Sequence, residues 1–135
     1  MALITWNETL HVGVVTIDQE HRKLVDMLNR LHDAMKAGKG ADLLGGLLAE
    51  LVAYTKTHFG NEERLMKRHN YPDYLKHKKE HNYLVLEAQK ALELHQQGQH
   101  LRPHDVQQFL VDWLTQHIKD EDRQTGRFLA GKGVV

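Results

Sequence analysis

The sequence predicts an all-α protein: an antiparallel up-down-up-down four-helix bundle with an N-terminal arm. Apolar residues recur with helical spacing through four segments of about 20 residues or more. Both prolines, Pro72 and Pro103, fall in short polar connectors between these segments. Period-two alternation with β-branched residues is confined to residues 12–15, so no sheet is expected. Short connectors between long helices favour the up-down-up-down topology.

The amino-acid composition excludes several classes of function. The length of 135 residues fits one domain over residues 1–135. The chain contains no cysteine, which excludes disulfides, thiolate metal sites and a cysteine nucleophile. The 18 basic and 18 acidic side chains cancel, so nucleic acid is not an expected partner. The N-terminus lacks the features of a signal peptide and no apolar run could span a membrane, so we expect a soluble, cytoplasmic protein. The charged outer faces of the predicted helices indicate a monomer.

The arm and the first helix are predicted from residue types at their boundaries. Residues 1–15 contain an aromatic and several aliphatic side chains, so we expect this arm to pack along the bundle over residues 16–130. The first helix is expected over residues 16–37. Thr16 and Gln19 have the spacing of a capping box, and Gly38 is expected to end the helix.

The other three helices follow with similar signals. The second is expected over residues 42–68, where the glycines at 45–46 weaken it because each interior glycine costs about 1 kcal/mol relative to alanine. The third opens near Asp73 and ends at Gly98. The fourth starts at Pro103, which suits a first helical turn because the N–H that proline lacks has no partner there.

Two pairs of potential metal ligands stand four residues apart. His58 precedes Glu62 in the second predicted helix, and His77 precedes His81 in the third. Residues four apart share one helix face, with Cβ atoms about 5–6 Å apart, which is close enough for one metal site. Each pair falls on the apolar stripe of its helix, so these side chains are expected to point into the bundle.

Two further histidines extend the cluster to all four helices. His21 lies near the start of the first helix and His117 in the second half of the fourth, which an antiparallel bundle brings to the same end as the two pairs. A lone inward histidine is more often a hydrogen-bonded core residue, but several at one level beside a buried glutamate indicate a cation. The donor groups outnumber the four ligands of one tetrahedral zinc ion, and none of them contains sulfur. This set suits two ions of iron, manganese or zinc.

The order and spacing of these residues resemble the hemerythrin family, in particular its single-domain bacteriohemerythrins. The resemblance covers most of the chain and rests on the series His21, His58-x-x-x-Glu62, His77-x-x-x-His81 and His117-x-x-x-x-Asp122. It implies a hemerythrin-like bundle with a non-haem di-iron site, two Fe2+/Fe3+ ions joined by a bridging oxo or hydroxo group, and O2 as ligand. The implied ligand set is three histidines on one iron (His77, His81, His117), two on the other (His21, His58) and two bridging carboxylates (Glu62, Asp122).

One implied ligand disagrees with simple helix geometry. Asp122 follows His117 by five residues, which is about 500° of rotation and thus about 140° away from the same face. Glu121, at four residues, aligns better and stays open as the alternative ligand. A π-bulge or loosened turn near Asp120 would bring Asp122 to the site, and such bulges occur often at functional sites.

Reversible O2 binding also needs a dry pocket. The apolar side chains next to the implied ligands are Leu24, Leu28, Phe59, Trp113 and Leu114. Ordinary core packing explains each of them at least as well. Leu114, one turn before His117, is the best single candidate for controlling access.

Three functions are compatible with such a site. The first, which we favour, is a non-enzymatic O2 carrier, store or supplier to an O2-consuming client enzyme. The second is a di-iron oxidase, peroxidase or NO-handling enzyme, although the two Glu-x-x-His helix pairs of ferritin-like oxidases are absent. The third is a sensor of O2 or iron that acts through a separate partner.

Overall fold

The computed structural model describes residues 6–98 and 101–134, with the backbone only at residues 41–42. Every regular element in this part of the chain is helical. In chain order the elements are the 3₁₀ turn η1 (Glu8–Leu10), α1 (Val15–Lys36), α2 (Gly40–Arg68), α3 (Tyr74–Gln96), α4 (Pro103–His117), the π-helical η2 (Ile118–Asp122) and α5 (Arg123–Gly131).

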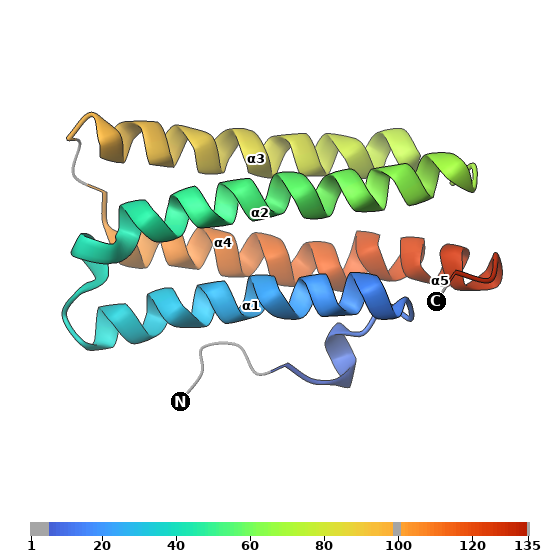
Figure 1. Cartoon of the computed structure of the whole chain (residues 1–135), viewed down its shortest axis with the longest axis horizontal. Coiled ribbons are helices and arrows are strands. Elements are labelled where there is room, and N and C mark those ends of the chain that lie inside the picture. Colours follow the sequence, from blue (N-terminus) through green and yellow to red (C-terminus); the bar gives the residue numbers. More distant parts are fainter. Residues whose placement is uncertain (1–5, 99–100, 135) are drawn as a thin grey trace.

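The helices form a four-helix bundle of alternating direction (Figure 1). Helix α1 packs against α2 and α4, and α2 also packs against α3. Helices α4 and α5, joined by η2, continue as one rod, so this rod supplies the fourth member of the bundle. The predicted all-α four-helix fold is therefore confirmed. In the part of the chain that the structure describes, no helix combines the length and apolarity needed to cross a membrane.

The start of α1 differs from the sequence prediction. The helix begins at Val15 behind an N-cap residue, Val14, that makes no side-chain cap. The predicted capping box of Thr16 and Gln19 is therefore wrong, because Thr16 already lies inside the helix. Val14 is fully buried and anchors the entry to the helix by packing. The first-turn carboxylate of Asp18 accepts a hydrogen bond of 2.8 Å from the backbone N–H of Val12, which ties the arm to the helix.

Helices α1 and α3 end at glycines in the left-handed backbone region. Gly38 has a φ of +75° and Gly98 a φ of +81°, a conformation that residues with a Cβ seldom adopt. Both positions are predicted helix stops, and the structure confirms them. At the other ends, Pro103 occupies the first turn of α4 and Asp73 is the N-cap residue of α3.

Gly45 and Gly46 have different roles within α2. A Cβ built on Gly45 would lie 2.7 Å from Cδ2 of His95, so the absent side chain allows α3 to approach α2 closely. A Cβ on Gly46 would meet nothing within 4 Å. Packing therefore explains the first glycine, and nothing in the structure explains the second.

The described part of the arm packs against the end of the bundle that carries η2 and α5. The Leu10 and Val12 side chains are both buried. The Arg123 guanidinium at the start of α5 donates a hydrogen bond to the carbonyl of Thr9. The carbonyl of Val12 rests on Gly126 of α5, where a Cβ would overlap the oxygen atom. The arm therefore closes over η2 and α5, which carry part of the site described below.

The contact at Gly126 predicts a stability difference between two glycine substitutions. Gly126→Ala should destabilise the protein by about 1–3 kcal/mol, because the new methyl group overlaps backbone that cannot move aside freely. The matched control Gly46→Ala, also inside a helix but in open space, should stabilise by roughly 0.5–1 kcal/mol through helix propensity. Urea unfolding of both variants measures the difference. Equal stabilisation by both would show that the arm does not press on α5.

Candidate metal centre

Seven polar side chains converge inside the end of the bundle where α1 and α3 begin and α2 ends. They come from α1 (His21), α2 (His58 and Glu62), α3 (His77 and His81), the last residue of α4 (His117) and the last residue of η2 (Asp122). None is more than 2 % exposed. Their donor atoms form two groups, each within 4.8 Å: Glu62, His77, His81, His117 and Asp122 in one, and His21, His58, Glu62 and Asp122 in the other. The structure thus brings together all seven sequence-predicted residues.

The π-helical turn decides which acidic residue joins this cluster. A π-helix bonds residue i to i+5, so over Ile118–Asp122 it rotates Asp122 onto the face of His117. An Asp122 oxygen lies 3.1 Å from Nε2 of His117. Glu121 instead lies 3.3 Å from the Lys76 ammonium. The predicted loosened turn near Asp120 is therefore present, and it places Asp122 rather than Glu121 in the cluster.

Each buried carboxylate faces both groups of histidines. One oxygen of Glu62, Oε1, lies 2.8 Å from Nε2 of His58 and 3.1 Å from Nε2 of His21. Its other oxygen, Oε2, lies 3.4 Å from Nε2 of His77 and 3.3 Å from Nε2 of His81. Glu62 therefore lies between the two groups of histidines.

The two carboxylate oxygens of Asp122 also face different groups of histidines. Its Oδ2 lies 2.9 Å from Nε2 of His21, and its Oδ1 lies 2.7 Å from Nε2 of His77. The two carboxylates therefore occupy equivalent places between the two histidine groups.

Four of the five imidazoles are oriented through their outer nitrogen. Nδ1 of His58 lies 2.7 Å from Oε1 of Glu20, and Nδ1 of His81 lies 3.0 Å from Oε2 of Glu63. Nδ1 of His117 lies 2.9 Å from Oε1 of Glu80, and Nδ1 of His77 lies 2.7 Å from Oγ1 of Thr125. Such contacts turn Nε2 inward and raise its basicity as a metal ligand. Nδ1 of His21 is buried and has no hydrogen-bond partner among the described residues.

These four orienting residues were not predicted from the sequence. Three of them stand next to a cluster residue: Glu20 before His21, Glu63 after Glu62 and Glu80 before His81. Each, however, contacts a histidine on the following helix. The carboxylates next to three of the predicted ligands are the signal that could have found these three residues. Their partners depend on how the helices are rotated against each other, which sequence spacing does not specify.

The charges of the cluster are strongly coupled. Burial lowers the pKa of His21, but the Asp122 carboxylate outweighs burial and raises that pKa to about 9. Burial likewise opposes the charge on His58, yet Glu62 raises its pKa to about 9. Burial alone would raise the pKa of Glu62, but the charge on His58 holds it well below the usual range. Without a metal ion, protonated imidazoles compensate the carboxylates.

Aromatic rings cover the outer side of the cluster. Phe59 stacks on His81 with ring centroids 3.8 Å apart, and Trp113 stacks on His117 at 4.4 Å. Phe59 is buried, whereas Trp113 is half-buried. Of the predicted pocket leucines, Leu24 and Leu114 lie buried one turn from a cluster histidine, and Leu28 lies two turns from His21.

The cluster fits metal ions better than it fits its own hydrogen bonds. Nε2 of His58 and Oδ1 of Asp122 are buried within 2.8 Å of oppositely charged partners, yet lack the alignment of a hydrogen bond. The Nε2 atom of His117 also lies 3.1 Å from those of both His77 and His81. Buried donor atoms gathered within 4.8 Å of one another could hold a metal ion. Imidazole and carboxylate donors suit iron, manganese or zinc.

The coupled charges predict the pH dependence of the metal-free protein. Histidines titrate near pH 6.5 in the unfolded chain, whereas His21 and His58 keep their protons to about pH 9 in the folded state. The folded state therefore binds more protons in this window, so its stability should fall as the pH rises from about 6.5 to about 9. The urea midpoint of chelator-treated protein at the two pH values measures this. A midpoint that stays constant or rises would contradict it, and His21→Gln should weaken the dependence.

Comparison with known proteins gives a consistent result. A family model described as the hemerythrin HHE cation binding domain matches residues 12–129. A bacteriohemerythrin of Stenotrophomonas maltophilia is 34% identical over 91% of this chain and 79% of its own length. One of Methylococcus capsulatus is 33% identical over 96% and 99%. A crystal structure of a wild-type hemerythrin superimposes with a TM-score of 0.88 at 32% identity, covering 96% of this chain and 99% of that one. The chain therefore belongs to the hemerythrin family.

Proposed function

We propose that this protein binds O2 reversibly at a non-haem di-iron centre and serves as an O2 carrier, store or supplier to an O2-consuming enzyme. The observation that carries the proposal is the pair of buried donor groups that share Glu62 and Asp122. Two groups with two common carboxylates match two ions held side by side. Family membership and the names of the relatives support iron and O2 as the metal and the ligand.

The donor set divides unequally between the two ions. In our assignment His77, His81 and His117 hold one iron, and His21 and His58 hold the other. Glu62 and Asp122 would offer an oxygen atom to each ion. The ion beside His21 and His58 would have fewer protein ligands, which would leave it more room for O2. When bound, two Fe(II) ions would supply the electrons for reversible O2 binding.

The remaining residues hold the donors in place and exclude water. Glu20 and Glu80 fix the ring planes of His58 and His117 through Nδ1. Buried Leu24 and Leu114 cover the inner side of the centre with hydrocarbon. Exclusion of water favours release of unchanged O2, because water and protons promote the loss of bound oxygen in reduced form. Five imidazoles against two carboxylates also favour binding over cleavage of the O–O bond.

The visible spectrum of the iron-loaded protein tests the proposal. The protein is loaded with Fe(II), reduced, desalted and assayed for iron per chain, then exposed to O2 and flushed with argon. We expect two irons per chain, and charge-transfer bands that appear with O2 and disappear under argon. Oxidation that argon does not reverse would instead support an oxidase or peroxidase. Failure to bind iron would overturn the proposal.

A double variant separates the assigned ligands from other iron-binding groups. His58→Ala with Glu62→Ala removes one terminal and one bridging ligand, so the bound iron should fall below two per chain and the O2 bands should be lost. Two irons bound by this variant would show that the ligand assignment is wrong. His32→Ala, which removes a half-buried histidine outside the cluster, is the control and should keep two irons.

Leu114→Ala tests the role of the hydrocarbon cover. The substitution opens a cavity beside the centre, so it should cost about 2.7–5 kcal/mol of stability and speed the oxidation of the O2-bound protein by admitting water. The control Leu75→Ala, at a side chain that is 77% exposed, should change stability by less than about 0.5 kcal/mol and leave the oxidation rate unchanged. Decay of the O2 bands measures the rate. An unchanged rate in Leu114→Ala would restrict Leu114 to a packing role.

A further inference from the structure

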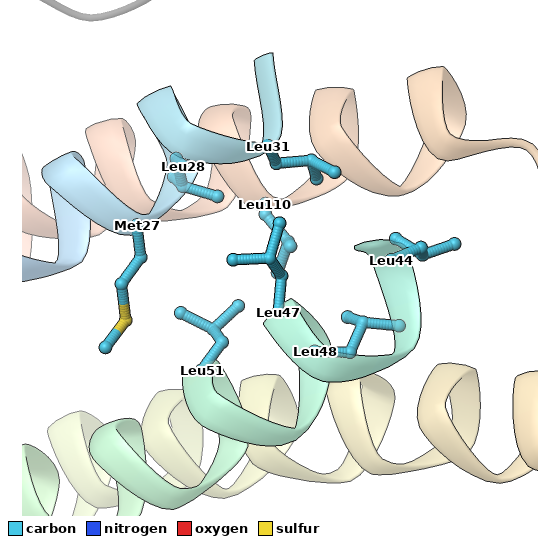
Figure 2. Close-up of a pocket in the computed structure, with 8 residues that line it drawn as sticks. All are labelled: Met27, Leu28, Leu31, Leu44, Leu47, Leu48, Leu51 and Leu110. Carbon is cyan, nitrogen blue, oxygen red and sulfur yellow. The ribbon is translucent and has the colours of Figure 1, made fainter. Parts of the chain in front are cut away.

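A second internal space lies in the apolar half of the bundle, between α1, α2 and α4. Figure 2 shows leucine side chains from these three helices directed toward it, with Met27 at its edge. Within it the centre of a water-sized molecule can move over about 10 Å³. The lining is entirely apolar: Met27, Leu28, Leu31, Leu44, Leu47, Leu48, Leu51 and Leu110.

On each of the three helices, one lining residue stands seven positions from a cluster histidine. Leu28 follows His21 by seven residues, and Leu51 and Leu110 precede His58 and His117 by seven. Seven residues of α-helix are two turns, or about 10 Å along the axis. The space therefore begins about two turns below the cluster and runs along the bundle away from it.

One layer of side chains separates the space from the cluster. It is formed by Leu24, Thr55 and Leu114, all of them buried and each three residues from a cluster histidine. The Thr55 hydroxyl already donates to the carbonyl of Val52 at 3.0 Å. The layer therefore offers little hydrogen bonding to water, and an apolar molecule would pass it when the leucines change rotamer.

Chemistry and size select the occupant. Water in a protein interior needs two to four polar partners, and the lining side chains provide none, so a space of this kind stays dry. Dry cavities take up small apolar molecules such as xenon. With room for the centre of one small molecule, the space fits an apolar diatomic gas and is too small for an organic substrate.

We propose that this cavity is a docking site for O2, which holds the gas inside the bundle before it passes Leu24 and Leu114 to the metal centre. The inference rests on the proposed O2-binding function for the identity of the gas. The docking site itself depends only on the leucine lining, so it can be tested apart from the iron chemistry.

Xenon under pressure is the probe for the docking site. Crystals of the iron-loaded protein should show a xenon atom between Leu28, Leu48 and Leu110. Leu48→Phe places a ring where the gas would lie, so the xenon atom should be lost. The matched control Leu43→Phe, on the same helix but 48% exposed, should retain it. Leu47→Ala widens the lining and should increase xenon occupancy, which keeps the test informative if Leu48→Phe folds poorly.

The rate of O2 association tests whether the docked gas reaches the centre. Stopped-flow mixing of the reduced protein with O2 should show association slowed up to about tenfold in Leu48→Phe, at the low end of the range that association rates span among mutants. Leu43→Phe should match the wild type. A wild-type crystal without xenon in the cavity would overturn the docking site, and equal association rates would overturn its role in delivery. Loss of O2 binding in the wild type itself would contradict the proposed function and leave the xenon result standing.

Discussion

Two carboxylates buried in the middle of a helical bundle set the main constraint on this protein. Glu62 and Asp122 are almost fully removed from water, where an uncompensated charge costs several kcal/mol. Among the described residues, imidazoles compensate these charges, and the carboxylates in turn raise the pKa values of His21, His58, His77 and His117. Metal ions would relieve the same constraint, because imidazole and carboxylate groups are both metal ligands and their donor atoms lie within 4.8 Å of one another in each group. Stability and metal binding are therefore properties of one cluster.

The orienting contacts link this cluster to the packing of the helices. Glu20 on α1 contacts a histidine of α2, Glu63 on α2 contacts one of α3, and Glu80 on α3 contacts one of α4. Helices α1, α2 and α3 each orient a cluster histidine of the following helix, so a rotation of any of these three would disturb a ring on its neighbour. The arm closes this end of the bundle through Thr9 and Val12, which contact α5. The bundle is held together at its polar end by hydrogen bonds and charge, and along the rest of its length by leucine packing.

The division into a polar and an apolar half also bears on function. O2 partitions into hydrocarbon, whereas water and protons do not, so for the proposed function a leucine-filled interior beside a polar centre would keep O2 away from the water and protons that promote its loss in reduced form. The layer of Leu24, Thr55 and Leu114 is the boundary between the two halves. It is one residue thick on each of α1, α2 and α4.

The sequence by itself determined the helical fold, the approximate helix ends and six of the seven converging residues, because helical periodicity and four-residue spacing are local properties. Asp122 was implied only by the resemblance to the hemerythrin family. The sequence also indicated the loosened turn before Asp122, since five residues cannot share an α-helical face. Other features depended on the tertiary structure: the start of α1 at Val15, the approach of α3 to Gly45, and the partners of Glu20, Glu63 and Glu80. The leucine-lined cavity belongs with these. Each is a relation between helices, fixed by how they rotate and pack against each other, and no periodicity within one segment encodes it.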